Sequence, residues 1–188
     1  MTIGNCINVL GIIAVGTEIA LLISKRAKGE QDIVTDARSL QVIWRTIGIG
    51  IGLTLLFRAL LPHPVFTRTL FEYVAGLLVL GGMALRWISI FYLGREFTVQ
   101  VAIIEGHRLT TNGPYRLIRH PSYAGLLLIF LGLAIHSNHP VGIIALTLPV
   151  FWAISNRIRI EERAMESYFG VEYAEYRKRT NKLIPHVY

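Results

Sequence analysis

A stretch of dense polarity at residues 113–125 is the first place in the sequence where chemistry is expected. It reads Gly-Pro-Tyr-Arg-Leu-Ile-Arg-His-Pro-Ser-Tyr-Ala-Gly, so cations and aromatic rings directly precede an apolar run. Pro114 and Pro121 disfavour helical backbone in the residue before them, which predicts a structured loop that ends as a helix begins near Pro121. Free backbone amides at such a helix start can bind a polar ligand. A positively charged loop that only leads into a membrane helix is the alternative.

Arg157 and Glu161 form a second polar group, four residues apart on one face of a predicted helix. Such a pair can simply stabilise a helix, by about 0.2–0.5 kcal/mol. An arginine at the membrane edge can also clamp a carboxylate with two hydrogen bonds, which lysine does poorly. Both interpretations stay open at this point.

Other kinds of site find little support in the sequence. His136 and His139 could share a helical turn, but a third ligand is missing nearby, so we expect no metal site. The Gly-x-Ser-x-Gly turn of serine hydrolases is absent. Ser122 follows Pro121 at a helix start, where helix capping is the expected role. Cys6 is the only cysteine, so no disulfide can form within the chain.

The composition indicates an integral membrane protein. Of the 188 residues 53% are hydrophobic and only 16% are charged, which is too apolar for a soluble protein that must cover its surface. The formal net charge of +7 could suggest a nucleic-acid partner, but the basic residues lie between and after apolar segments and form no single face. We therefore expect membrane lipids, and no nucleic acid, as partners of these charges.

Five apolar runs predict an all-α, polytopic membrane protein with about five transmembrane helices. They cover residues 4–23, 42–61, 70–93, 121–135 and 141–155. The last two runs would be only about 22 Å long, which predicts a short helical hairpin in a thinned region. The charged tail from residue 156 predicts an amphipathic helix that lies on the headgroup surface or caps the loop, on the cytoplasmic side. Gly48, Gly50 and Gly52 predict a close helix contact in the second run.

The basic residues predict the orientation. Segments 24–41, 94–119 and 156–188 carry most of the 19 Lys and Arg residues and are expected in the cytoplasm. Five spans then put the amino terminus outside. Glu18, Arg45 and Arg86 fall in the cytoplasmic half of their helices, where an unpaired charge costs up to about 3 kcal/mol. We expect Glu18 to pair with Arg45 or Arg86.

The hairpin determines which polar groups meet. It connects the loop that ends at residue 120 with the tail that begins at residue 156, and both are expected on the cytoplasmic side. The turn Arg119-His120-Pro121 should therefore lie beside the segment that contains Arg157, Glu161 and Glu162.

These motifs resemble one family. The run 119–125, the pair Glu161-Glu162, the pair Phe169-Gly170 and the ending Leu183-Ile184-Pro185 are similar to the isoprenylcysteine carboxyl methyltransferase family, in its prokaryotic-type integral membrane form. The resemblance spans residues 100–185 and is weak in the first two helices. We expect a single membrane domain over 1–188. The apolar runs predict three transmembrane helices in 1–93, and the resemblance implies a cofactor-binding loop, hairpin and tail in 94–188.

The resemblance also implies an S-adenosylmethionine pocket on the cytoplasmic side and a lipophilic, prenylcysteine-like acceptor whose carboxylate is methylated. Arg157 matches the residue that receives the acceptor. Positions that match the family's cofactor segments are Gln100, His107, Arg108, Leu109, Thr110, Tyr115, His120, Pro121, Ser122, Tyr123 and Glu161. Thr110 stands where relatives often have Val, and Leu126 stands where many have Trp. Neither difference removes a needed polar group, but we expect the one at Leu126 to reshape the lipid-facing acceptor channel.

Elementary chemistry agrees with a carboxylate acceptor, and three alternatives remain. A carboxyl group with a pKa near 4 is ionised at neutral pH, so its attack on a sulfonium methyl group needs no general base.

A phospholipid amine or a small thiol would be the acceptor in related membrane methyltransferases. A sterol-reductase-like protein would instead bind NADPH and transfer hydride. A non-enzymatic membrane scaffold would bind lipid headgroups through the loop.

Overall fold

The computed structural model describes residues 2–24, 33–36, 38–60, 68–103, 106–185 and 187, without the side chains of 33–35, 58 and 68. The basic cluster at 25–28, the predicted chain break at 62–64 and His186 lie outside the described residues.

Helices make up most of the described chain, so the prediction of an all-α protein is confirmed. Four helices are long and apolar enough to cross a membrane: α1 (Ile3–Ser24), α2 (Arg38–Leu60), α3 (Arg68–Leu93) and α5 (Pro140–Phe169). α4 (Pro121–His136) is apolar but has only 16 residues, about 24 Å, which is less than the ~30 Å bilayer core.

The prediction of two short helices in the hairpin is wrong for the second one. α5 continues as one helix of 30 residues through the change from apolar to charged composition near residue 156. Arg, Glu, Ala and Met are good helix formers, so a change in polarity does not end a helix. α5 ends at Phe169, and the next residue, Gly170, has a φ of 54° that suits glycine. The remaining tail forms the short helix α6 (Val171–Arg179).

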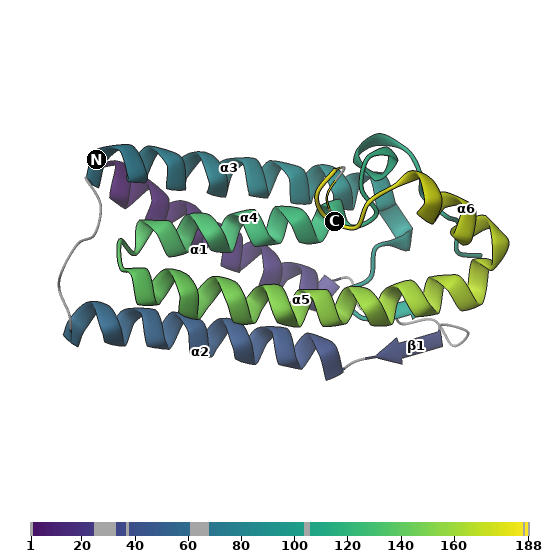
Figure 1. Cartoon of the computed structure of the whole chain (residues 1–188), viewed down its shortest axis with the longest axis horizontal. Coiled ribbons are helices and arrows are strands. Elements are labelled where there is room, and N and C mark those ends of the chain that lie inside the picture. Colours follow the sequence, from purple (N-terminus) through teal and green to yellow (C-terminus); the bar gives the residue numbers. More distant parts are fainter. Residues whose placement is uncertain are drawn as a thin grey trace.

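The helices are arranged around the short α4 (Figure 1). α4 packs between α3 and α5, and α2 covers the outer side of α5. α1 crosses behind this layer and contacts α3 and α4. α1 and α2 therefore pack on different partners.

Glycines allow the closest helix contact, between α3 and α4. A Cβ added to Gly82 would lie 2.6 Å from the carbonyl oxygen of Gly125, and one added to Gly132 would lie 2.7 Å from the carbonyl oxygen of Ala75. In the predicted contact of α2, only Gly50 touches a neighbour, the backbone of α5, while Gly48 and Gly52 have nothing nearby. The expected close contact at Gly48 and Gly52 is therefore wrong. These two residues are four apart and lie on one face of α2, and α5 packs on a different face.

Short elements close one end of the bundle. They are β1 (Ile33–Asp36), which pairs antiparallel with β2 (Val101–Ile103), and the 3₁₀ turns η1 (Gly94–Glu96) and η2 (Gly113–Arg116). After α6 the chain returns to the start of α4, where the Arg119 N–H donates to the Asn181 carbonyl at 2.8 Å and the His120 N–H to the Lys182 carbonyl at 3.0 Å. The tail thereby fixes the backbone just before α4.

The α3–α4 contact generates a test of the fold. Gly82→Ala should lower the free energy of unfolding in detergent by about 1–3 kcal/mol, because the new methyl group meets backbone atoms that cannot move aside. Gly81→Ala is the matched control, since a Cβ there meets nothing within 4 Å. Equal apparent unfolding temperatures for the two variants would show that α3 and α4 do not approach as described.

Candidate functional site

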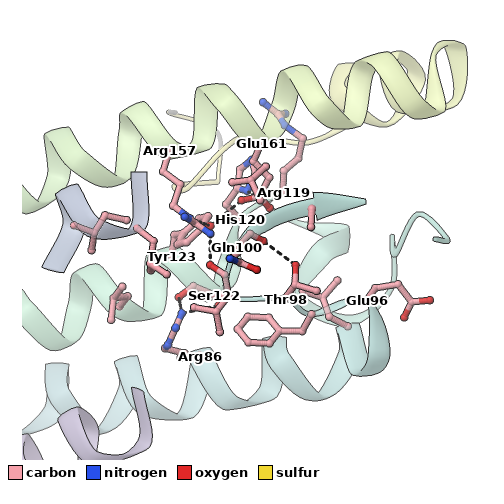
Figure 2. A pocket seen from close by; sticks show the side chains of 18 of the residues that line it. Arg86, Glu96, Thr98, Gln100, Arg119, His120, Ser122, Tyr123, Arg157 and Glu161 are labelled. Carbon is pink, nitrogen blue, oxygen red and sulfur yellow. Dashed lines mark hydrogen bonds and ion pairs between the residues drawn. The ribbon is translucent and has the colours of Figure 1, made fainter. Parts of the chain in front are cut away.

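A large cavity lies at the end of the bundle where the short elements β2, η1 and η2 are found. Figure 2 shows it from close by. The space between its walls is about 1560 Å³, open solvent at its mouth included. The segments 96–103 and 107–110, the start of α4 and the polar part of α5 form its polar walls. Its apolar walls run deeper between α1, α2 and α4 and include Val15, Ile43, Trp44, Ile47 and Phe130. The cavity therefore joins a polar chamber to an apolar groove.

Most of the site residues expected from the sequence line this one cavity. They are Gln100, His107, Leu109, Thr110, Tyr115, His120, Ser122, Tyr123, Arg157 and Glu161. Two are not part of its walls: Arg108 is exposed, and Pro121 is fully buried at the first turn of α4. Proline suits that position because its missing N–H has no partner in a first turn anyway. The roles of all these residues stay predictions.

Arg157, a residue that is only 3% exposed, lines this cavity, and two of its partners are Tyr123 at the polar start of α4 and Ser39, one turn before Ile43 of the apolar wall. Its Nε donates to the Tyr123 hydroxyl at 2.7 Å, its Nη1 to the Ser39 hydroxyl at 2.9 Å, and its Nη2 to the Val99 carbonyl. A guanidinium carries five N–H donors, so these three bonds leave two N–H groups for another acceptor. The group is thus oriented by the protein and still able to bind a carboxylate.

Tyr123 connects Arg157 to the acidic part of α5. Its hydroxyl donates to the Glu161 carboxylate at 2.7 Å, while its ring stacks on His120 with the centroids 5.8 Å apart. Nδ1 of His120 lies 3.8 Å from Glu161 and its Nε2 3.4 Å from Glu162. Figure 2 shows Arg157 and Glu161 extending from α5 toward His120 and Tyr123 at the start of α4. The predicted meeting of these two segments is confirmed.

Arg119 and Glu162 hold the tail against this site. The Arg119 Nε donates to Glu162 at 2.8 Å with both side chains buried, and its Nη1 donates to the carbonyl groups of Arg177, at 3.3 Å, and Thr180. Lys182 lies 3.6 Å from the other Glu162 oxygen. Glu162 therefore fixes the tail, while the neighbouring Glu161 faces the cavity.

Arg86 forms the opposite wall and is paired with Glu18, which confirms one of the two predicted partners. Its Nε and Nη2 donate to the Glu18 carboxylate, the latter at 2.6 Å. Its Nη1 donates to the Ser122 hydroxyl at 2.8 Å and to the Ser122 carbonyl at 3.2 Å. The expected capping role of Ser122 is wrong, because the helix N-cap is His120 and the serine hydroxyl faces Arg86 instead.

Histidine and tyrosine side chains complete the polar chamber. Burial lowers the pKa of His107 below its ordinary value, and its Nδ1 is buried with no hydrogen-bond partner among the described residues. Its ring packs edge-on against Phe169. Burial raises the pKa of Tyr115, whose hydroxyl donates to the Ser89 carbonyl at 3.3 Å. A neutral imidazole with an unused nitrogen can accept or donate one hydrogen bond, which fits a polar ligand in this chamber.

Sequence reasoning missed several residues of the walls. Ser39 and Val99 contact Arg157 directly, but nothing in their local sequence distinguishes them from ordinary helix-start and loop residues. Trp44 lies on the apolar wall, where its type resembles any membrane-facing aromatic. Arg86 did carry a signal, because a charge inside an apolar helix needs a partner.

Comparisons with known proteins point to methyltransferases. A family model described as phospholipid methyltransferase matches residues 71–172. A probable protein-S-isoprenylcysteine O-methyltransferase of Oryza sativa subsp. indica is 33% identical over 118 residues, which cover 62% of this chain and 62% of the relative. Protein-S-isoprenylcysteine O-methyltransferase of Homo sapiens is 34% identical over 117 residues, or 61% of this chain and 41% of the relative.

A solved structure agrees with these relatives. The eukaryotic intramembrane Ras methyltransferase ICMT (isoprenylcysteine carboxyl methyltransferase) matches with a TM-score of 0.61 and 26% sequence identity, over 77% of this chain and 52% of that chain. The match therefore covers about half of that protein and less than two thirds of the curated relatives. With the four long apolar helices, the likeness to an intramembrane protein identifies this chain as a membrane protein.

The Glu18–Arg86 pair generates a test by double-mutant cycle. Glu18→Ala should lower the free energy of unfolding in detergent by about 3 kcal/mol, because it leaves a largely buried guanidinium without its anion. Adding Arg86→Met should restore part of that loss, with a coupling of at least ~1 kcal/mol. The control is Arg45→Met, which removes an exposed cation and should be additive with Glu18→Ala. Additivity of Glu18→Ala with Arg86→Met would contradict the pair.

Proposed function

The chain belongs to the phospholipid methyltransferase family, and from this premise we propose that it transfers a methyl group from S-adenosylmethionine to the carboxylate of a lipophilic, prenylcysteine-like acceptor at the membrane. The names of the curated relatives support the choice of acceptor. The chain spans only 62% of the length of the Oryza sativa relative.

The orientation of Arg157 is the observation that carries the proposal. Three protein acceptors hold the guanidinium at the junction of the polar chamber and the apolar groove, and two N–H groups remain. A carboxylate on an apolar chain matches this junction, with the anion on Arg157 and the chain in the groove. A phospholipid amine is a poorer match, because a cation would have to approach a buried arginine.

The reaction places few chemical demands on the protein. S-adenosylmethionine supplies a methyl group on a positively charged sulfur, and the acceptor carboxylate is already ionised at neutral pH. One carboxylate oxygen forms a bond to the methyl carbon as the carbon–sulfur bond breaks, and the products are an ester and a neutral thioether. No proton moves, so the chain needs no general base, and alignment alone can contribute up to about 7–11 kcal/mol.

The polar chamber has groups suited to the cofactor. Glu161 and the imidazoles of His107 and His120 can hydrogen-bond hydroxyl and amino groups. The expected free amides at the start of α4 are not available at Tyr123 and Ala124, because both N–H groups donate to the His120 carbonyl. The walls also carry an aromatic ring at Tyr115 and apolar contacts at Leu109. Gln100, Thr110, Ser122 and Tyr123 complete the proposed cofactor set in the walls, next to the exposed Arg108 and the buried Pro121.

The packing of the helices supports lateral entry of the acceptor from the membrane. α1 contacts α3 and α4, whereas α2 contacts α5, and apolar residues of α1 and α2 line the same groove. A prenyl chain can therefore pass between these two helices without crossing a polar surface.

We also propose that the cavity faces the cytoplasm and the amino terminus faces outside. α6, whose last turn carries Arg177, Lys178 and Arg179, lies at one end of the bundle, and the amino terminus lies at the opposite end (Figure 1). This orientation gives the cavity access to the cytosolic cofactor.

The acceptor class is tested by an assay with radiolabelled S-adenosylmethionine and purified protein. N-acetyl-S-farnesylcysteine should become labelled in a base-labile ester, whereas phosphatidylethanolamine and a small thiol should not, because only the first has a carboxylate as the methyl-accepting group next to Arg157. Label in phosphatidylethanolamine alone would replace the proposed acceptor with a phospholipid amine. Binding of NADPH in place of S-adenosylmethionine, measured by calorimetry, would overturn the methyltransferase itself.

The role of Arg157 is tested separately from cofactor binding. Arg157→Ala should lower kcat/KM for N-acetyl-S-farnesylcysteine at least a hundredfold, because the carboxylate loses a charge-assisted partner, and should leave the Kd for S-adenosylmethionine within about threefold. His120→Ala should instead weaken cofactor binding. Arg159→Ala, an exposed cation two residues further along α5, is the control. Equal loss of both affinities in Arg157→Ala would assign Arg157 to the cofactor.

A further inference from the structure

We propose that Ser39 is a positioning residue for the acceptor: its hydroxyl orients the Arg157 guanidinium so that the two remaining N–H groups face the acceptor carboxylate. The inference rests on the proposed function. It starts from the 2.9 Å hydrogen bond from Arg157 Nη1 to Ser39 Oγ, in which the serine is only 6% exposed. Ser39 lies outside the region matched by the family model, in the half of the chain where the sequence indicated no site residue.

Three different elements determine the orientation of this guanidinium. Tyr123 holds its Nε from α4, Val99 holds its Nη2 from the loop before β2, and Ser39 holds its Nη1 from the first turn of α2. The guanidinium is planar and rigid, so acceptors on three nitrogens fix both its position and its plane. Without Ser39, the group could turn about the line that joins the other two contacts.

The first turn of α2 is itself held in place. The Asp36 carboxylate accepts the N–H of Arg38 at 2.7 Å and the N–H of Ser39 at 3.1 Å. Burial alone would raise the pKa of Asp36, but hydrogen bonds from Ser39 and the Arg38 N–H, together with the charge of Arg157, lower it below its ordinary value. An ionised Asp36 thus fixes the backbone that carries the Ser39 hydroxyl, so the contact with Arg157 does not depend on a mobile turn.

One face of α2 lies beside both the carboxylate and the apolar chain of the proposed acceptor. Ser39, Ile43 and Ile47 are spaced by four residues, are all buried, and lie on the same side of the helix. Ile43 and Ile47 line the apolar groove, while Ser39 holds the guanidinium at its polar end. α2 therefore sets the distance between the carboxylate site and the groove, which selects acceptors with both groups at that separation.

The test compares an acid with its own ester. The two ligands are N-acetyl-S-farnesylcysteine and its methyl ester, which share the farnesyl chain and differ in the carboxylate. Ser39→Ala should weaken binding of the acid about tenfold and leave binding of the ester unchanged, because only the acid uses the oriented guanidinium. Ser39→Thr, which keeps the hydroxyl, should restore most of the preference for the acid.

Matched measurements distinguish positioning from loss of structure. Thr46→Val removes a hydroxyl from the same helix, where it bonds only to the Val42 carbonyl, and should change neither affinity. A parallel loss of acid and ester binding in Ser39→Ala would mean that Ser39 only supports the fold, and an unchanged preference for the acid would overturn the inference outright. Failure of the wild-type protein to methylate the acid would reject the proposed function instead, so the two failures are separable.

Discussion

Burying a guanidinium group is unfavourable unless its N–H groups find acceptors, and three arginines meet that demand around one cavity. Arg86 is held by Glu18 and Ser122, Arg119 by Glu162 and Thr180, and Arg157 by Tyr123, Ser39 and Val99. Most of these partners lie far away in the sequence. Each arginine therefore fixes the relative position of segments that apolar packing alone would not fix. Together the three arginines determine the shape of the polar chamber.

The short helix α4 makes this arrangement possible. Its glycines let α3 approach to backbone contact, α5 packs on its other side, and α2 covers the outer side of α5. Because α4 is shorter than a bilayer core, its polar first turn lies deeper in the molecule than the ends of its neighbours, and the returning tail covers it. The chamber is thus formed by helix lengths as much as by side chains.

Under the proposed function the two halves of the chain divide the ligands between them. The loop, α4 and α5 supply the groups suited to a polar cofactor, whereas α1 and α2 supply the apolar groove and the serine that orients Arg157. The reaction neutralises an anion and a cation without moving a proton, so precise placement of the two ligands matters more than acid–base chemistry.

The sequence by itself determined the membrane character and the apolar helices, because hydropathy is a local property. It also determined that the Arg119-His120-Pro121 turn meets the start of the tail, since the hairpin between them brings the two segments together. Finally, it determined that Glu18 pairs with an arginine, because a charge inside an apolar helix requires a partner. It did not reveal that α5 continues to Phe169, since composition and helix continuity are separate properties. Only the tertiary structure decided which of two arginines pairs with Glu18, which glycines touch, and that Ser39 meets Arg157 across 118 positions. Those contacts depend on the rotation and register of packed helices, which no short stretch of sequence specifies.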